Sequence, residues 1–332
     1  MDRSVFIREQ WEGKIFANKE INFEALALEA FQYQAHQNPV YREFVQALGT
    51  DSHKVDRIEK IPFLPISFFK THEVKTGSFT PALCFESSAT TGMVTSKHYL
   101  KDPALYLQSF MSGFIRFKGP IKNWCIIGLL PSYLERKNSS LVYMTDTLIR
   151  ESGHPQSGFY LNDTARLRDV LLDLEKQGQP TLLIGVTFAL LDFAATNPIP
   201  LKHTQIIETG GMKGRGRELV RAEVHDILQS AFGVRAIGAE YGMTELLSQA
   251  WSLGLGIFEC PPWMKVLVRD EEDPLTVKKS GNGALNIIDL ANIDSCCFIA
   301  TEDAGKVYAN GQFEMLGRMD GSDLRGCSLL TA

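Results

Sequence analysis

The sequence lacks the features of several common classes of protein. No apolar run approaches the roughly 20 residues that a membrane-spanning helix needs, and the first residues do not have the layout of a signal peptide. The formal net charge is −5, without the basic excess that is typical of nucleic-acid-binding proteins. We therefore expect neither a membrane protein nor a protein that binds nucleic acid.

The cysteines also lack a recognisable arrangement. None forms a Cys-x-x-Cys pair, and their spacing does not match a metal site. We expect reduced thiols and hence a cytoplasmic protein. The six cysteines are Cys84, Cys125, Cys260, Cys296, Cys297 and Cys327.

The order of the expected elements predicts an α/β fold. A chain of 332 residues exceeds one typical domain, because a single core stops growing at about 250–300 residues. Up to about residue 260, apolar runs of strand length alternate with helical patterns, which favours parallel, doubly wound sheets. The expected strands are 124–130, 181–186, 204–208 and 234–238, and the expected helices are 18–50, 163–178, 187–194 and 217–232.

The pattern changes near Trp263, after which short strands follow one another without a long helix. These strands are expected at 264–268, 283–289, 296–300, 306–308 and 312–316. We predict paired α/β subdomains over residues 1–260, a β-rich subdomain over 261–320 and a short tail over 321–332.

The stretch Ser87–Lys97 is rich in hydroxyl residues. It does not belong in a core, because each buried hydroxyl needs a hydrogen-bond partner. It can wrap a phosphate instead: Gly92 permits a tight turn, and Lys97 supplies positive charge. The P-loop pattern of ordinary NTPases is absent from it. A polar surface loop is the alternative interpretation.

A second stretch, Gly238-Ala-Glu-Tyr-Gly-Met-Thr-Glu245, lies about 150 residues downstream. Together the two stretches resemble motifs of the adenylate-forming enzymes, which include the acyl- and aryl-CoA synthetases. Ser88-Ala-Thr-Thr-Gly92 is similar to their phosphate loop, and Tyr241-Gly-Met-Thr-Glu245 is similar to their nucleotide motif. The resemblance implies the large N-terminal domain of that fold. It also implies nucleotide-binding roles for Ser88, Thr90, Thr91, Gly92, Lys97, Gly238 and Tyr241.

The same resemblance implies ATP and Mg²⁺ as cofactors and a carboxylic acid as substrate. Joining a carboxylate to the α-phosphate of ATP brings two anions together, so the site must neutralise charge. Glu245 would bind Mg²⁺, Thr244 would hydrogen-bond the α-phosphate or acyl carbonyl, and Tyr241 would stack on adenine. The alternative is a strand-end loop with an incidental tyrosine and glutamate.

Two later stretches extend the resemblance. Thr301-Glu-Asp303 is similar to a Thr-Gly-Asp motif whose aspartate binds ribose, although Glu302 replaces the glycine. Leu316-Gly-Arg-Met-Asp320 is similar to a hinge motif in which Arg318 would contact ribose or phosphate and Asp320 would be the pivot. Arg318 is alternatively a solvated partner in an ion pair.

The acyl pocket is predicted from three residues. Gly210-Gly211 matches a turn that lines the acyl pocket in this superfamily, and glycine suits a backbone that passes close to a ligand. His154 is a further candidate for the pocket wall, with a purely structural role as the alternative.

The end of the sequence resembles one branch of the superfamily. Most members continue past the hinge into a small C-terminal domain with a catalytic lysine, which we expect to be absent here. The LuxE-type acyl-protein synthetases have this architecture, and Ile61–Lys70, Pro131–Met144 and Leu324–Ser328 look like that branch. In it, an adenylated fatty acid passes to a cysteine near the C-terminus and then to a partner protein. Cys327 is the match, and Arg325 would favour its thiolate; an ordinary tail cysteine is the alternative.

We therefore predict an AMP-forming acid–thiol ligase. It would activate a fatty or aryl carboxylate as acyl-AMP, release pyrophosphate and transfer the acyl group to its own cysteine or a partner protein. Two alternatives stay open: an acyl- or aryl-CoA ligase with coenzyme A as acceptor, and a non-catalytic subunit that binds an acyl group or nucleotide.

Overall fold

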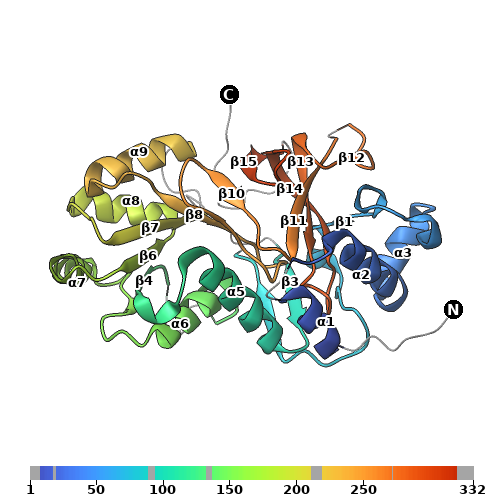
Figure 1. Cartoon of the computed structure of the whole chain (residues 1–332), viewed down its shortest axis with the longest axis horizontal. Helices are drawn as coiled ribbons and strands as arrows, with labels where there is room; N and C mark the ends of the chain where they lie inside the picture. The colour runs from blue at the N-terminus through green and yellow to red at the C-terminus, as the bar shows by residue number, and fades with distance from the viewer. Residues whose placement is uncertain are drawn as a thin grey trace. The chain divides into compact units, whose positions relative to one another are not determined.

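The computed structural model describes residues 8–17, 20–88, 94–131, 137–210, 219–270 and 272–319, which form two compact units (Figure 1). Unit 1 holds the described residues of 1–113, 244–249 and 260–313. Unit 2 holds those of 114–243, 250–259 and 314–319. The predicted subdomain boundaries at residues 260 and 320 stay predictions.

Unit 1 combines N-terminal helices with a mostly antiparallel sheet. Its helices are α1 (Arg8–Ile15), α2 (Phe23–Gln37), α3 (Pro39–Ala47), α4 (Phe68–Thr71), the first part of α5 (Pro103–Lys118), η1 (Ser52–Lys54) and η2 (Ile58–Lys60). Its strands are β1 (Leu64–Pro65), β2 (Leu83–Glu86), β3 (Lys97–Leu100), β11 (Met264–Arg269), β12 (Val277–Lys278), β13 (Gly281–Asp289) and β14 (Phe298–Val307).

Asparagine side chains cap two of the N-terminal helices of unit 1, and the second of these helices begins at the predicted break. The Asn22 side chain accepts a hydrogen bond from the Ala25 amide at the start of α2. Asn38 caps α3 in the same way, and Pro39 occupies its first turn, where a missing N–H does no harm. The helical pattern over 18–50 is therefore confirmed as two helices that divide at Pro39.

The long strands of unit 1 confirm the change of pattern near Trp263. β13 pairs antiparallel with β11 and β14, and β1 adds to β14 in parallel. The predicted strands 296–300 and 306–308 are one continuous strand, β14, and residues 281–318 contain no helix. Gly283 has φ of 155°, and a Cβ there would lie 2.4 Å from the Arg269 carbonyl oxygen, so this close crossing requires glycine.

Unit 2 is built on a parallel sheet with an antiparallel extension. Its helices are α6 (Ser140–Ser152), α7 (Thr164–Gln177), α8 (Thr187–Thr196), α9 (Arg221–Phe232) and η3 (Ile121–Asn123). Its strands are β4 (Cys125–Leu129), β5 (Gly158–Phe159), β6 (Thr181–Gly185), β7 (Thr204–Thr209), β8 (Gly238–Tyr241), β9 (Ala250–Ser252), β10 (Ile257–Glu259) and most of β15 (Phe313–Arg318). The strand order is β15-β10-β9-β8-β7-β6-β4-β5.

The doubly wound arrangement predicted for this part of the chain is confirmed. Strands β5, β4, β6, β7 and β8 run parallel, and Figure 1 shows α8 and α9 along one face of the sheet and α6 on the other. Apolar β4 and β6 are buried along their whole length, as a strand covered on both faces must be. Asp163 caps α7, and Gly178 ends it in the left-handed conformation.

Two details of unit 2 correct the predictions. The strand expected at 234–238 instead runs from Gly238 to Tyr241, because residues 234–237 carry the chain from the end of α9 back to the sheet. The helix expected at 217–232 is α9, which begins at Arg221; on it Ile227 is 43% exposed, while His225 is buried.

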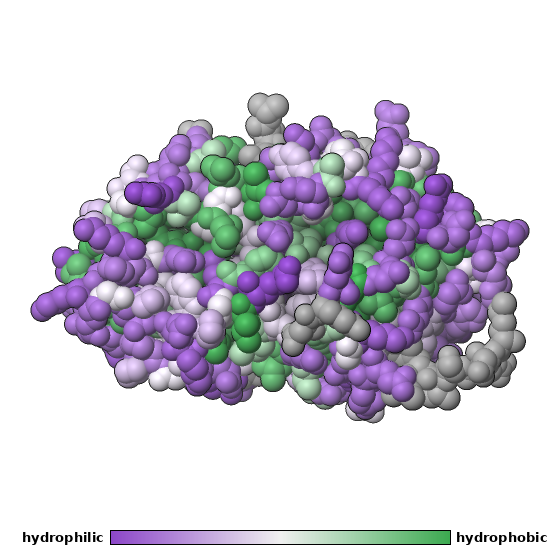
Figure 2. All heavy atoms as spheres, viewed as in Figure 1, coloured by the Kyte–Doolittle hydropathy of each residue, from purple (hydrophilic) through white to green (hydrophobic). Residues whose placement is uncertain are grey.

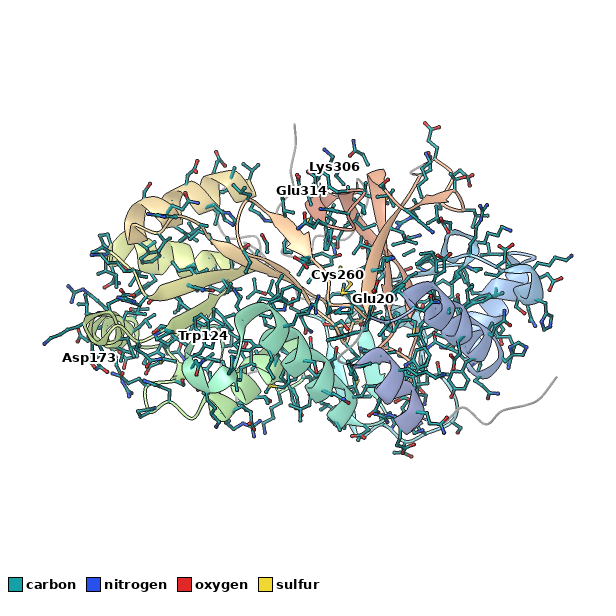
Figure 3. The ribbon with its side chains drawn as sticks, in the orientation of Figure 1. Glu20, Trp124, Asp173, Cys260, Lys306 and Glu314 are labelled. Carbon is teal, nitrogen blue, oxygen red and sulfur yellow. The ribbon has the colours of Figure 1, made fainter. Side chains whose placement is uncertain are left out.

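The outer surface is largely polar. On the face shown in Figure 2, hydrophilic residues predominate, with apolar residues in small patches. Figure 3 shows Asp173 on α7, where its carboxylate accepts hydrogen bonds from Gln156 and Gln177, while Trp124 is buried and donates to the Lys118 carbonyl. Within the described residues, every helix is too short or too polar to cross a lipid bilayer.

Candidate functional site

The hydroxyl-rich stretch is closed at its base by a hairpin in unit 1. Strands β2 and β3 pair antiparallel, with Glu86 opposite Lys97. The Ser87 amide donates to the Ser96 carbonyl at 3.0 Å, and the Ser96 amide donates to the Ser87 hydroxyl at 2.9 Å. Ser88 and Lys97 are therefore exposed at the same end of the hairpin. Thr90, Thr91 and Gly92 lie outside the described residues.

The two predicted catalytic residues of the nucleotide motif also belong to unit 1. Thr244 and Glu245 lie in a turn outside any helix or strand; Thr244 is half-buried, and Glu245 is fully buried. Nδ1 of His98 lies 2.8 Å from the Thr244 carbonyl oxygen, and Nδ2 of Asn292 donates to the Glu245 carbonyl oxygen at 2.7 Å. A carbonyl oxygen only accepts, so the Nδ1 atom of His98 carries the proton.

His98 therefore connects the hairpin to the nucleotide motif. It follows Lys97 in β3, and its ring lies edge-on to Phe69 at a centroid distance of 5.9 Å. Burial lowers the pKa of His98 to about 4, against the opposing effects of its bonds to Thr244 and Asn292. The imidazole is neutral at physiological pH, so it acts here as a fixed hydrogen-bond donor and not as a charge.

The next residues of the turn are held by Asp289, at the end of β13. Its Oδ2 atom accepts from the amides of Leu247 (2.8 Å) and Ser248 (2.9 Å), and its Oδ1 atom accepts from the Ser248 hydroxyl at 2.6 Å. Burial raises the pKa of Asp289, and these hydrogen bonds oppose the rise. Trp263 Nε1 donates to the Ser248 hydroxyl oxygen at 3.0 Å, which completes a buried network beneath the turn.

Asp303, the predicted ribose ligand, lies in β14 of the same unit and is 5% exposed. Its amide donates to the Thr301 hydroxyl oxygen at 3.2 Å, and that hydroxyl donates to the Leu285 carbonyl at 2.8 Å. The buried guanidinium of Arg269 donates to the same carbonyl and to the Asn286 side chain. Among the described residues, unit 1 thus carries five of the predicted ones: Ser88, Lys97, Thr244, Glu245 and Asp303.

Tyr241, the predicted adenine-stacking residue, ends β8 in unit 2. Its ring meets Phe258 of β10 edge to face, with centroids 5.9 Å apart. The Arg221 guanidinium lies 5.3 Å from the centre of the Phe258 ring, and its Nη1 atom donates to the Met315 carbonyl at 3.3 Å. The Tyr241 ring is therefore packed against Phe258 of β10, which in turn contacts Arg221 of α9.

The remaining predicted residues are distributed over unit 2. Gly210 follows β7 with φ of 23°, and Arg318 is the last residue of β15. A Cβ at Gly238 would lie 2.6 Å from Ile207 and 2.9 Å from the Ser252 carbonyl oxygen, so strand packing alone requires this glycine. His154 Nδ1 accepts a hydrogen bond from the Gln156 amide within its own turn, at 3.2 Å. Gly211 and Cys327 lie outside the described residues.

Comparison with known proteins identifies the family. A family model described as acyl-protein synthetase, LuxE, matches residues 14–332. The chain belongs to this family. No curated protein sequence matches the chain.

Two solved structures, of MatB and of a MatB chimera, confirm the predicted fold of this LuxE-family chain. ATP-bound MatB from Rhodopseudomonas palustris is 17% identical with a TM-score of 0.53, and the match covers 74% of this chain and 49% of MatB. An ATP-bound RpMatB–BxBclM chimera is 18% identical with a TM-score of 0.51, with the same coverage. O-succinylbenzoate coenzyme A synthetase (MenE) from Bacillus subtilis, in complex with ATP and magnesium, is 14% identical with a TM-score of 0.49; the match covers 76% of this chain and 54% of MenE. The LuxE-family chain thus spans about half the length of these structures.

Sequence reasoning missed most of the network around the motif. His98, Asn292 and Asp289 were not predicted as site residues, although His98 directly follows Lys97. It also missed two hydroxyl–carboxylate pairs at the carboxyl edge of the parallel sheet in unit 2. There the Thr209 hydroxyl donates to Glu240, and the Thr187 hydroxyl donates to Glu208. Polar residues directly after apolar strand runs, as in Ile206-Ile-Glu-Thr209, are the sequence signal that could have found these pairs.

The Glu245 carboxylate, in the motif Tyr241–Glu245, is compatible with a magnesium ion. No group of three or more His, Cys, Asp or Glu side chains in the described ranges is arranged to hold a metal. Mg²⁺ typically binds one or two carboxylates together with substrate phosphates, so a dedicated protein cage is not needed. The Glu245 carboxylate, beside Thr244, is a hard oxygen donor of the type that Mg²⁺ prefers.

Proposed function

We propose that this LuxE-family protein activates a carboxylic acid with ATP. A carboxylate oxygen of the acid attacks the α-phosphorus of ATP, and the bond to the bridging oxygen breaks. The products are acyl-AMP and pyrophosphate. The acyl group then passes to a thiol, which releases AMP.

One observation carries the proposal: the hydrogen bond from His98 to the Thr244 carbonyl. It joins β3, the strand that starts at Lys97, to the turn that carries Thr244 and Glu245. The strand that follows the phosphate-loop-like stretch and the Thr244–Glu245 end of the nucleotide motif are thus joined within unit 1, although the bonded pair lies 146 positions apart. The likeness to MatB, whose structure contains ATP, supports the same interpretation.

Each residue has a definite task in this proposal. Lys97 is exposed at the hairpin base, where its ammonium can neutralise phosphate charge. Thr244 would donate its hydroxyl proton to the α-phosphate or acyl carbonyl. Glu245 would hold Mg²⁺, which when bound offsets the negative charge that develops on the phosphates. Asp303 would accept hydrogen bonds from the ribose hydroxyls, and Tyr241 would stack on adenine.

The acceptor thiol belongs to the protein itself or to a partner protein in our proposal, with Cys327 as the residue that is acylated. Coenzyme A is the alternative acceptor. The described cysteines Cys84, Cys125, Cys260, Cys296 and Cys297 are not in disulfide bonds. Free thiols suit a reducing compartment, so we place the reaction in the cytoplasm.

The proposal is tested with the purified chain, ATP, Mg²⁺ and a panel of fatty and aryl acids. We expect pyrophosphate release that depends on one class of acid, with acyl-AMP detected by mass spectrometry. A Lys97→Met variant should lose most of this release, whereas Lys54→Met, at an exposed lysine of the same unit, should retain it. Nucleotide binding without acid-dependent pyrophosphate release would instead favour the binding-subunit alternative.

A further inference from the structure

Two consecutive main-chain carbonyl groups, those of Thr244 and Glu245, accept hydrogen bonds from side chains of distant residues. His98 donates to the first and Asn292 to the second, at 2.8 and 2.7 Å. The turn lies outside helices and strands, so side chains hold these carbonyls where a helix or sheet ladder would otherwise do so. His98 is 1% exposed and Asn292 is fully buried. Water does not compete for such bonds, which makes them stronger than exposed ones.

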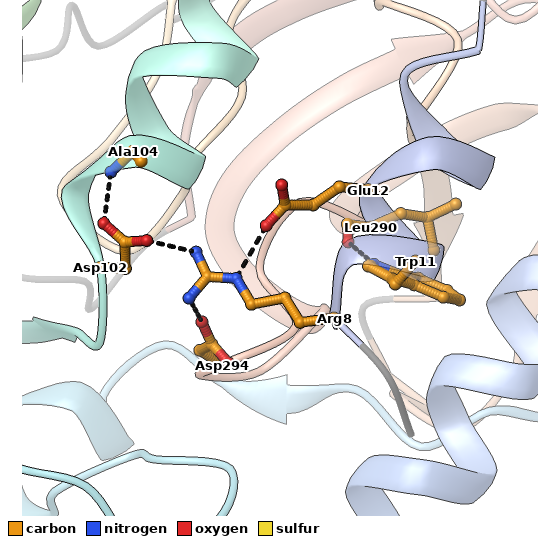
Figure 4. Close-up of polar contacts among 7 residues, drawn as sticks. All are labelled: Arg8, Trp11, Glu12, Asp102, Ala104, Leu290 and Asp294. Atoms are coloured by element: carbon orange, nitrogen blue, oxygen red, sulfur yellow. Dashed lines mark hydrogen bonds and ion pairs between the residues drawn. The ribbon is translucent and has the colours of Figure 1, made fainter. Parts of the chain in front are cut away.

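Asn292 is itself held rigidly. It lies in the turn after β13, where its main-chain N–H donates to the Asp289 carbonyl at 3.0 Å. The Gln34 side chain of α2 donates to the Asn292 carbonyl at 3.1 Å. Helix α1 fixes the same turn, because Trp11 Nε1 donates to the Leu290 carbonyl at 3.0 Å (Figure 4). The main chain of Asn292 and its turn are therefore held by contacts with α1, α2 and the end of β13.

Arg8 joins α1 to the residues just after Asn292 by ion pairs. Its guanidinium forms ion pairs with Glu12 at 2.8 Å, with Asp294 at 3.2 Å and with Asp102 at 3.6 Å (Figure 4). Asp294 follows Asn292 by two residues, and Asp102 precedes α5. The support of the Asn292 turn thus reaches from the N-terminal helix to the residues just before α5.

From this geometry we propose that His98 and Asn292 are positioning residues of the acyl-adenylate reaction. The proposal rests on the proposed function. By fixing the carbonyls of Thr244 and Glu245, the two side chains fix the peptide planes on either side of Glu245. Those planes set the directions of the Thr244 hydroxyl and the Glu245 carboxylate. Neither His98 nor Asn292 needs to contact ATP for this role.

The inference predicts a loss in turnover that exceeds the loss in nucleotide binding. Misplacing groups that act on developing charge lowers kcat, because their interaction is strongest in the transition state. For Asn292→Ala and His98→Leu we expect kcat to fall about 10–100-fold, the usual range for residues that orient a ligand-binding group. We expect KM for ATP to change by less than about threefold.

Two further variants separate positioning from general stability. Tyr41→Phe removes another buried donor to a main-chain carbonyl of unit 1, the 2.6 Å bond to Pro62, far from the turn in sequence. It should lower the melting temperature while kcat of the folded enzyme stays within about twofold of wild type. His98→Asn keeps an N–H donor at the position of Nδ1 and should recover part of the kcat that His98→Leu loses. Equal kcat values for Asn292→Ala and Tyr41→Phe would overturn the inference.

A measurement without substrate distinguishes this inference from the proposed function. Hydrogen exchange of the peptide spanning residues 244–249 reports the Leu247 and Ser248 amides, which donate to Asp289. Asn292→Ala should speed this exchange at least about tenfold, and Tyr41→Phe should leave it unchanged. If wild-type protein releases no pyrophosphate with any acid, the proposed function fails. The exchange result still tests whether Asn292 holds the turn in place. Unchanged exchange in Asn292→Ala would refute the positioning role of Asn292, even if the enzyme is active.

Discussion

The Thr209 hydroxyl donates a 2.9 Å hydrogen bond to Oε2 of Glu240 in the neighbouring parallel strand. Burial raises the pKa of Glu240 to about 7; the Thr209 bond opposes this, and the charge of Glu208 adds to it. A carboxyl group at the ligand-binding edge of the sheet is thus close to half-protonated at neutral pH. This relationship leads to the first prediction.

Glu240→Gln should remove a pH-dependent loss of stability. The carboxyl group ionises in the unfolded chain at about pH 4.5 but in the fold only near pH 7, so the folded state binds more protons between these values. The free energy of unfolding should therefore fall as pH rises from 4.5 to 7 and level off above, by no more than about 3 kcal/mol. Urea unfolding at pH 5 and pH 8 checks this. The difference between the two pH values should shrink in Glu240→Gln but not in Glu151→Gln, at an exposed glutamate of α6.

Glu245→Gln should reduce Mg²⁺-dependent turnover far more than nucleotide affinity. Glutamine preserves the size of this buried side chain but removes the charge that would hold the metal. Because the metal acts mainly on charge in the transition state, we expect kcat to fall by about two orders of magnitude. Steady-state kinetics with a Mg²⁺ titration, beside direct nucleotide binding, checks this. Equal losses in turnover and in affinity would speak against the metal role.

Phe258→Leu should weaken ATP binding without slowing the chemical step. The Phe258 ring supports Tyr241 edge to face and lies beneath Arg221. An aromatic pair of this kind is worth about 0.5–1.5 kcal/mol, so KM for ATP should rise by a factor of about 2–10. Phe193→Leu, at a buried ring stacked on Phe232 in the same unit, is the control and should change stability alone. A fall in kcat with constant KM would contradict adenine stacking by Tyr241.

Cys327→Ser should abolish acylation of the protein if Cys327 is the acceptor. Seven residues separate it from the predicted pivot at Asp320, and an extended chain of that length spans about 20–25 Å. A tail of this reach can enter a nearby site. The enzyme is incubated with ATP and a labelled fatty acid and then treated with neutral hydroxylamine, which cleaves thioesters. Retention of the same hydroxylamine-labile label in Cys327→Ser would assign acylation to another cysteine, and absence of label in wild type would favour coenzyme A.

The sequence by itself determined the local elements and the kind of chemistry. Helix α7 lies between the caps Asp163 and Gly178, because a capping side chain and a left-handed glycine act on neighbouring residues. The apolar runs of β4 and β6 likewise predict strands buried on both faces. The motif Tyr241–Glu245 indicated adenylate formation through its resemblance to the nucleotide motif of that superfamily, and such a resemblance can be recognised without a fold.

Only the tertiary structure decided how the motif is held in place. The contact of His98 with Thr244 joins residues 146 positions apart, and that of Asn292 with Glu245 joins residues 47 apart. Nothing in a local pattern selects these partners, since the pairing of β2 with β3 and the turn after β13 place them. Burial along α9 is likewise a tertiary property: His225 is buried and Ile227 is exposed, although isoleucine is the more apolar residue. Periodicity along the chain fixes what each segment is, whereas burial between distant segments fixes which polar atoms meet.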